Sequence, residues 1–335
     1  MHAMLSSETA LRLASVDDFL GDRQNRFFGE GFKRVTQDLT EITVRPGAAR
    51  IDATAGIRIP GTWSRKGQAH QRPHLSTIDA MVFGARLTGL YAAHTHGLSA
   101  DDPFLVRSVS IKAGTSPDEE NLDHFGVSGT VAATSEGSVP GRLRTTMDCA
   151  VGSMTVRVEA DHPGTRGAAP GSAEGSYSVA QSLDGPWNDA PFGASHHGRH
   201  QFLADVQAED HTADADLTIT NETGPDGPRL PATMVDLFVS ALQLGQILLY
   251  RLDGVDRASS HTLWMRSTTI TPVPTVAAGA AYTAAAAADE GDGRFRVTLA
   301  RPAKLPAKQG TWRAARITAT HAGLRLACNV AHLLP

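Results

Sequence analysis

The sequence is poor in several features that mark particular classes of protein. Its 335 residues include only two cysteines, Cys149 and Cys328, and both lie in apolar, strand-like runs. Such cysteines fit a reducing cytoplasm better than a disulfide framework. The 31 Lys and Arg residues are balanced by 35 Asp and Glu, a net charge of −4, so nucleic-acid binding is not expected. No run approaches the ~20 apolar residues of a membrane span, and the N-terminal residues do not resemble a secretory signal. We therefore expect a cytoplasmic protein without nucleic-acid or membrane partners.

Several motifs of known chemistry are also missing. There is no Gly-x-Gly-x-x-Gly after a strand, no P-loop and no Gly-x-Ser-x-Gly. These absences argue against a nucleotide cofactor and against a serine hydrolase of the α/β type. Histidines cluster at His94 and His96 and again within residues 196–200, but neither cluster has a standard metal-ligand spacing. We expect neither a metal nor a cofactor.

What the chain does have is 41% hydrophobic residues, enough for a sizeable core, and a break in composition near its middle. Residues 163–175 are rich in Gly, Pro, Ala and Ser and lack hydrophobic periodicity, which is typical of a linker. The sequence thus predicts an N-terminal tail (1–15), a first unit (16–162), this linker (163–175) and a second unit (176–335).

Both units show the same order of predicted elements: two strands, one long apolar helix, then further strands. The predicted helices cover residues 75–93 and 231–252. The predicted strands cover residues 34–44, 50–59, 104–112, 126–133, 143–150 and 154–160 in the first unit, and 201–206, 216–220, 262–270, 295–299, 314–320 and 324–330 in the second.

The two units also align residue by residue. Residues 77–82 (TIDAMV) match 234–239 (MVDLFV) at a shift of 157 positions, and residues 106–111 (VRSVSI) match 265–270 (MRSTTI) at a shift of 159. Two nearly equal shifts over adjacent elements indicate an internal duplication.

A long, mostly apolar helix followed by antiparallel strands is typical of the hot-dog fold, in which the sheet wraps the helix. Two such units in one chain predict an α+β protein with a double hot-dog architecture. A doubly wound α/β fold competes with this interpretation, but it requires strands and helices in alternation.

Asp79 and Asp236 occupy equivalent positions in the two predicted helices. A carboxylate in an apolar helix is costly to bury unless it is paired or has a task. Both are therefore candidate catalytic residues; in hot-dog dehydratases an acid on this helix faces a histidine. The alternative is structural, with each aspartate capping a loop or pairing with Arg107 or Arg266.

His74 immediately precedes the first helix and is the candidate general base. Ser76 and Thr77 are suited to the helix N-terminus, whose free N–H groups could hold a thioester oxyanion. The second unit has Pro231 in place of His74, which is expected if one of two sites survives. A surface histidine at a helix start is the alternative.

Further candidates are polar residues around this helix. Arg65, Lys66 and Arg72 form a basic loop that could hold phosphate, although a solvated loop is the simpler explanation. Arg86 and Gln243 each follow a helix aspartate by seven positions and would line a tunnel between the units.

Four segments resemble the avirulence D (AvrD) family of bacteria: SVDDFLG at residues 15–21, RFFGEGFK at 26–33, RPHLSTID at 72–79 and LWMR at 263–266. The resemblance runs from about Val16 to the C-terminus and implies the synthesis of syringolide-type butenolides, a task similar to that of A-factor-type hot-dog enzymes.

The implied reaction joins a β-ketoacyl group, carried as a thioester on acyl carrier protein or coenzyme A, to a sugar or sugar phosphate such as xylulose 5-phosphate. Intramolecular condensation then closes a butenolide. A hot-dog dehydratase or thioesterase and a non-enzymatic lactone-binding module are the alternatives. A monomer is feasible, and a homodimer is at least as common for an enzyme of this size.

Overall fold

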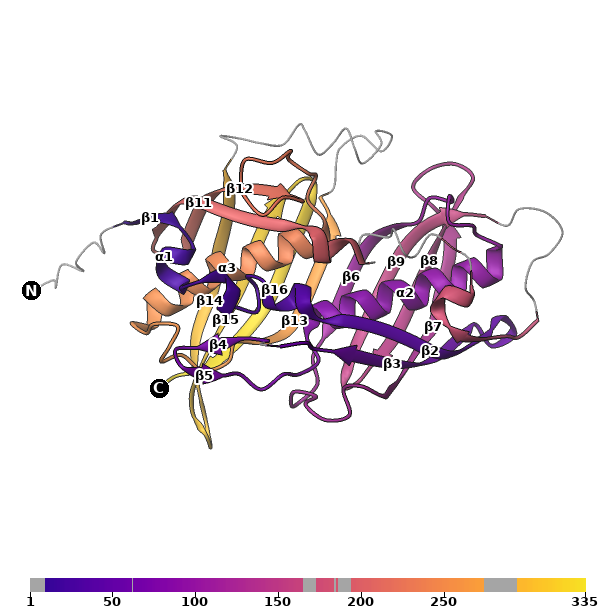
Figure 1. Cartoon of the computed structure of the whole chain (residues 1–335), viewed down its shortest axis with the longest axis horizontal. Coiled ribbons are helices and arrows are strands. Elements are labelled where there is room, and N and C mark those ends of the chain that lie inside the picture. The colour runs from indigo at the N-terminus through magenta and orange to yellow at the C-terminus, as the bar shows by residue number, and fades with distance from the viewer. Residues whose placement is uncertain (1–9, 62, 165–172, 184, 186–193, 274–293) are drawn as a thin grey trace, which may run out of the picture.

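The computed structural model describes residues 10–61, 63–164, 173–183, 185, 194–273 and 294–335. Over this part of the chain, two long helices lie along the longest axis of the molecule and a 14-stranded antiparallel sheet curls around them (Figure 1). A short hairpin of two strands stands apart from that sheet. Strands and helices do not alternate, so the doubly wound alternative is wrong.

Each predicted helix and strand is present, with ends that differ by at most four residues except at the strand predicted for residues 295–299, which extends to Ala307. The first unit contains β2 (Thr36–Arg45), β3 (Arg50–Arg58), α2 (Thr77–His96), β6 (Leu105–Lys112), β7 (Phe125–Glu136), β8 (Arg142–Val151) and β9 (Met154–Pro163). The second contains β11 (His200–Glu209), β12 (Thr212–Thr220), α3 (Met234–Asp253), β13 (Trp264–Pro272), β14 (Phe295–Ala307), β15 (Gly310–His321) and β16 (Leu324–Leu333).

The strand order repeats outward from a central seam between β13 and β6. On one side of the seam the order is β6-β9-β8-β7-β3-β2, and on the other it is β13-β16-β15-β14-β12-β11. At the seam Ser110 pairs with Thr269, and these two residues are equivalent in the sequence repeat. On either side of this pair, Val109 lies opposite Ile270 and Ile111 lies opposite Thr268. Each of these residues is equivalent in the repeat to a residue of the other pair. The predicted duplication is therefore also a pseudo-twofold in the sheet.

Both helices are buried on every side near their N-termini. The residues from Thr77 to Ala85 in α2, and from Met234 to Gly245 in α3, are all buried. A helix that is apolar all round must be enclosed by the fold. Gly84 allows close approach to the sheet, since a Cβ there would lie 2.8 Å from Val156 Cγ1.

Helix α3 is long and apolar enough, with a mean hydropathy of 1.3, to pass for a membrane span by length and composition. This property of α3 differs from the expectation that no run approaches a membrane span. Because 83% of that apolar stretch is buried inside the fold, the enclosing sheet accounts for its composition. Both cysteines are likewise buried and free.

The outermost strand at each end of the sheet comes from the other half of the chain. Strand β1 (Leu11–Ser15), within the predicted N-terminal tail, pairs with β11, while β10 (Gly175–Val179) pairs with β2. Of the predicted linker, residues 165–172 lie outside the described part of the chain. The two halves therefore exchange edge strands.

Shorter elements connect these parts. They are α1 (Asp17–Leu20), η1 (Arg23–Asn25), η2 (Gly31–Arg34), η3 (Pro46–Ala48), η4 (Ala180–Ser182) and η6 (Ala194–Gly198). The separate hairpin consists of β4 (Arg65–Lys66) and β5 (Ala69–His70), and Lys66 extends from it to the second half of the chain.

Candidate active site

Both helices begin with the same arrangement of hydrogen bonds. In α2 the Ser76 hydroxyl accepts from the Asp79 backbone N–H at 3.2 Å, and Asp79 Oδ2 accepts from the Ser76 N–H at 2.9 Å. In α3, Thr233 and Asp236 repeat these bonds at 3.2 and 2.7 Å. This reciprocal capping box satisfies backbone donors that a helix N-terminus leaves unpaired. The aspartates are thus explained by helix capping, and none of the described hollows in the structure is lined by either.

The caps differ in one charged partner. Gln37 Nε2 donates to Asp79 Oδ1 at 2.8 Å, and Gln201 Nε2 donates to Asp236 Oδ1 at 2.7 Å. Asp236 alone also receives the Arg199 guanidinium, with Nη2 at 2.8 Å from Oδ2. Burial raises the pKa of Asp79.

Of the structural alternatives for the aspartates, capping fits the structure, whereas the described contacts of Arg107 and Arg266 lie elsewhere. Arg107 Nε lies 3.8 Å from an oxygen of Asp161, and Arg266 donates to the backbone oxygen of Gly114. These two arginines lie on strands at the seam, whereas the aspartates lie in the first turns of the helices.

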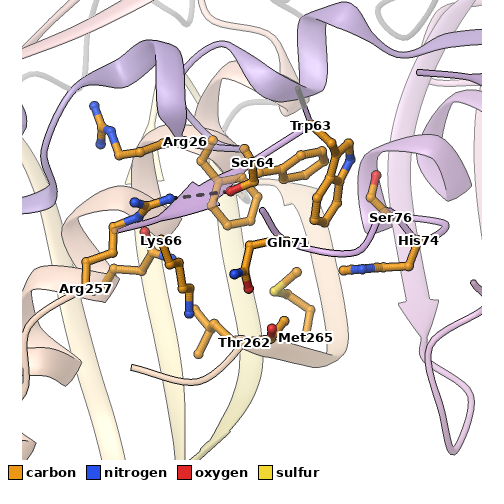
Figure 2. Close-up of a pocket in the computed structure, with 14 residues that line it drawn as sticks. Arg26, Trp63, Ser64, Lys66, Gln71, His74, Ser76, Arg257, Thr262 and Met265 are labelled. Carbon is orange, nitrogen blue, oxygen red and sulfur yellow. Dashed lines mark hydrogen bonds between the residues drawn. The ribbon is translucent and has the colours of Figure 1, made fainter. Parts of the chain in front are cut away.

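A cavity of about 60 Å³ lies beside the start of α2, and both halves of the chain contribute to it. Figure 2 shows His74 on one side and the basic groups of Lys66 and Arg257 on the other. Among the residues that the structure describes, no carboxylate lines this cavity. Its lining consists of Arg26, Phe27, Phe28, Trp63, Ser64, Lys66, Gln71, His74, Ser76, Gln246, Arg257, Thr262, Leu263 and Met265.

His74 is held between an aromatic ring and the backbone. The edge-on Trp63 ring lies 4.6 Å from the imidazole, centroid to centroid, and Nδ1 lies 3.4 Å from the Arg72 carbonyl oxygen. Burial lowers the pKa of His74 below its ordinary value of 6.5. This shift favours the neutral imidazole, the form that a general base requires.

Three cations line the cavity with little compensating negative charge. Lys66 Nζ donates to the backbone oxygen of Ser260 at 2.9 Å, and burial lowers the pKa of Lys66 to about 8. Arg257 donates to Ser64 Oγ at 3.4 Å, and burial lowers its pKa as well. Arg26 does have a carboxylate partner, Asp17. Lys66 and Arg257 are half-buried cations without an acidic partner among the described residues, and such cations favour an anionic ligand.

The family of the chain follows from its match to a family model. That model, described as Pseudomonas avirulence D protein (AvrD), matches residues 11–335. The chain belongs to the AvrD family. No match was found among curated proteins.

Solved structures similar to this AvrD-family chain include three that are covered over most of their length. The tesB protein of Mycobacterium avium subspecies paratuberculosis is 11% identical, covering 87% of this chain and 95% of its own, with a TM-score of 0.37. A putative thioesterase from Novosphingobium aromaticivorans is 14% identical, with coverages of 88% and 98% and a TM-score of 0.37. The 12:0-ACP thioesterase from Umbellularia californica is 11% identical, with coverages of 85% and 94% and a TM-score of 0.38. At these values the likeness carries no information on activity.

The structure brings some of the predicted site residues of this AvrD-family chain together. His74, Ser76 and Lys66 line the cavity. Thr77 lines a small hollow next to it, and Arg72, paired with Glu119, lines a larger outer hollow; His74 lines both as well.

Other predicted site residues lie elsewhere. Arg86 donates to the backbone oxygen of Gln37, Gln243 Oε1 accepts from Arg26 at 2.9 Å, and Arg65 lies 3.4 Å from Gln68. None of the three lines the cavity or the two hollows next to it.

The cavity also contains residues that the sequence analysis missed, namely Arg26, Trp63 and Arg257. A signal existed for Arg26, since it begins one of the segments that resemble the AvrD family. The S/T-x-x-D pattern before each helix was likewise available and predicts the capping boxes directly.

Proposed function

We propose that this AvrD-family chain is a double hot-dog enzyme that acts on acyl thioesters. It joins a β-ketoacyl group, carried on acyl carrier protein or coenzyme A, to a hydroxyl of a sugar or sugar phosphate such as xylulose 5-phosphate. The observation that carries this proposal is a neutral His74 facing three cations in a cavity without a lining carboxylate. A base and an anion-binding surface in one cavity suit acyl transfer to a phosphorylated alcohol.

The double hot-dog assignment rests on the enclosed helices and on the mirrored strand order. Each half contains one long helix enclosed by antiparallel strands, and the halves meet at β6 and β13 to make one sheet. Residues from both halves of the chain line the cavity, so the proposed reaction needs no second copy of the chain. A homodimer and a cytoplasmic location remain predictions.

In the proposed reaction, His74 removes the proton from the acceptor hydroxyl as its oxygen attacks the thioester carbonyl. The C–S bond breaks, the ester C–O bond forms, and His74 returns the proton to the leaving thiolate. Backbone N–H groups at the start of α2, near Thr77, stabilise the oxyanion. The activated methylene then loses a proton and its carbon attacks the sugar ketone, whose oxygen takes up a proton; this C–C bond closes the ring. The new hydroxyl and the remaining hydrogen of the former methylene leave as water, which forms the C=C bond of the butenolide.

Lys66, Arg257 and Arg26 hold the phosphate in this proposal. We assign Asp79 and Asp236 to helix capping, because their oxygens already accept hydrogen bonds within the caps. This assignment leaves His74 as the base and replaces the catalytic roles considered for the two carboxylates.

The test measures thiol release from a β-ketoacyl thioester with and without xylulose 5-phosphate. We expect release that depends on the sugar phosphate, and we expect His74→Gln to lower it by at least ~100-fold, the usual contribution of a general base. His211→Gln changes an exposed histidine outside the cavity and serves as the matched control. Release without the sugar would point to a thioesterase and an enoyl product to a dehydratase. Lactone binding without turnover would indicate a binding module.

A further inference from the structure

A second concave surface lies on the outer face of β13–β16, on the far side of the sheet from α3. This outer groove has a volume of about 570 Å³, within the range of small-molecule sites. It is lined by two tryptophans, three arginines and an exposed leucine: Trp264, Trp312, Arg266, Arg301, Arg316 and Leu305.

The aromatic floor of the outer groove is formed by β13 and β15, which flank β16 on either side. The rings of Trp264 and Trp312 stack with their centroids 5.8 Å apart and their planes inclined by 24°. Arg266 lies over Trp264, with Cζ 5.5 Å from the ring centroid. Leu305, the cross-strand partner of Trp312, is 50% exposed and extends the apolar surface. The two tryptophans are half-buried, and the exposed part of such an aromatic surface can stack on a planar base.

The arginines of the outer groove have no acidic partner among the residues that the structure describes. Neither Arg301 nor Arg316 forms an ion pair there, and the Arg316 Nε is buried without a hydrogen bond. Arg301 sits in a β-bulge with a φ of 52°, a conformation uncommon for a side chain larger than glycine. Bulges redirect side chains at functional sites, and here the result is a third cation on one surface.

The internal repeat supplies a comparison surface within the same molecule. In the first half, the residue equivalent to Arg266 is Arg107, which pairs with Asp161. Asp161 lies opposite Leu105 on β6, and the equivalent pair in the second half is Ala331 opposite Trp264. The second half thus has alanine in place of the acid and tryptophan in place of leucine. Both replacements favour an aromatic anion as ligand.

The outer groove adjoins a second hollow that reaches His74. This is the outer hollow described above with Arg72, and it is lined by Gln71, His74 and the same two tryptophans, Trp264 and Trp312. A ligand whose base and phosphates lie in the outer groove could therefore extend a flexible arm along this hollow to the base. This is the layout of an acyl-coenzyme A: a nucleotide at one end and a thioester at the other.

We propose that the outer groove binds the adenosine 3′-phosphate 5′-diphosphate end of coenzyme A, so that the acyl donor is a coenzyme A thioester. This inference rests on the proposed function for the thioester, but nucleotide binding is measured without turnover. The base stacks on the tryptophans while Arg266, Arg301 and Arg316 hold the phosphates.

The experiment titrates the full chain with coenzyme A, adenosine 3′,5′-bisphosphate and pantetheine, followed by calorimetry and tryptophan fluorescence. We expect the first two to bind and to quench fluorescence, and pantetheine to bind far more weakly. Ala331→Asp restores the acid found in the first half and should weaken coenzyme A binding by about tenfold or more. The double variant Arg301→Gln with Arg316→Gln should do the same. Arg325→Gln, on the same outer face but outside the outer groove, is the matched control.

Two results would overturn the assignment. They are no binding of coenzyme A, and binding of coenzyme A that Ala331→Asp leaves unchanged. Failure of the proposed function looks different. If acyl-pantetheine is turned over in a His74-dependent way while coenzyme A does not bind, only the outer-groove inference fails. If coenzyme A binds but no thioester is consumed, the function fails and the outer-groove assignment stands.

Discussion

His74 and Lys66 line the same cavity, and burial lowers the pKa of both side chains. A base must be neutral to work and an anion-binding amine must be charged, so the two groups limit activity from opposite directions. The enzyme should therefore be active at pH values between the pKa of His74 and the pKa of Lys66.

For His74, we expect the profile of kcat/KM against pH to fall on its acid side, below pH 6.5. Because the pKa of His74 lies under its ordinary value of 6.5, kcat/KM for the thioester should fall only at pH values below 6.5, and tenfold per pH unit once the pH is below the pKa of His74. The Glu119 carboxylate raises this pKa, so Glu119→Gln should move the fall to lower pH. A fall that begins above pH 6.5 would argue against His74 as the base.

For Lys66, the expected result appears at the alkaline end. The amine loses its proton near its pKa of about 8, so KM for a phosphorylated acceptor should rise above that pH. Lys66→Gln should raise KM by about tenfold at pH 7, as expected for loss of a charge-assisted hydrogen bond, and should flatten the alkaline dependence. Initial rates with a sugar and with its phosphate separate the effects. An equal change for both acceptors would place Lys66 away from the phosphate.

The helix caps allow a test of stability at the level of single elements. Asp236→Asn leaves Arg199 without its carboxylate and should lower the free energy of unfolding by about 3 kcal/mol, as for other broken buried pairs. Asp79→Asn removes a cap with no cationic partner, and about 1 kcal/mol is expected. Urea unfolding measures both values. Adding Arg199→Gln should recover part of the loss in Asp236→Asn, and equal losses in the two single variants would contradict this account.

Hydrophobic periodicity was sufficient to predict the long helices and most strands, because each buries a regular apolar pattern along its own length. Strands β1 and β10 were missed, since five-residue segments at the edge of a sheet carry too short a pattern. Their pairing with the opposite half depends on the path of the whole chain.

The candidate site was predicted only in part, for a related reason. His74, Ser76 and Lys66 are close to one another in sequence and line the same cavity. Arg26 and Arg257 reach the same cavity from distant loops, and no local pattern links them. Asp79 and Asp236 stood out as acids in apolar helices, but their polarity is already explained by the caps.

On the scale of the whole molecule, the exchanged edge strand β1 should protect the sheet. Leu13 packs against the core from β1, whereas Arg12 is exposed on the same strand. Leu13→Asp should release β1, uncover the edge of β11 and promote association between copies. Light scattering and thermal unfolding measure the effect. Arg12→Asp is the control with the same new residue, and association in both variants would show that charge alone is responsible.

The exchange of β1 and β10 also bears on the order in which a nascent chain acquires its structure. β10 is translated after the six strands of the half whose edge it covers, and β1 is translated before the half to which it binds. On the ribosome, the first half emerges with an open edge until residue 179 is exposed, and β1 has no template until β11 appears. Synthesis therefore passes through a stage in which β1 and the edge of β2 are both unpaired. At that stage both segments are exposed and available to chaperones.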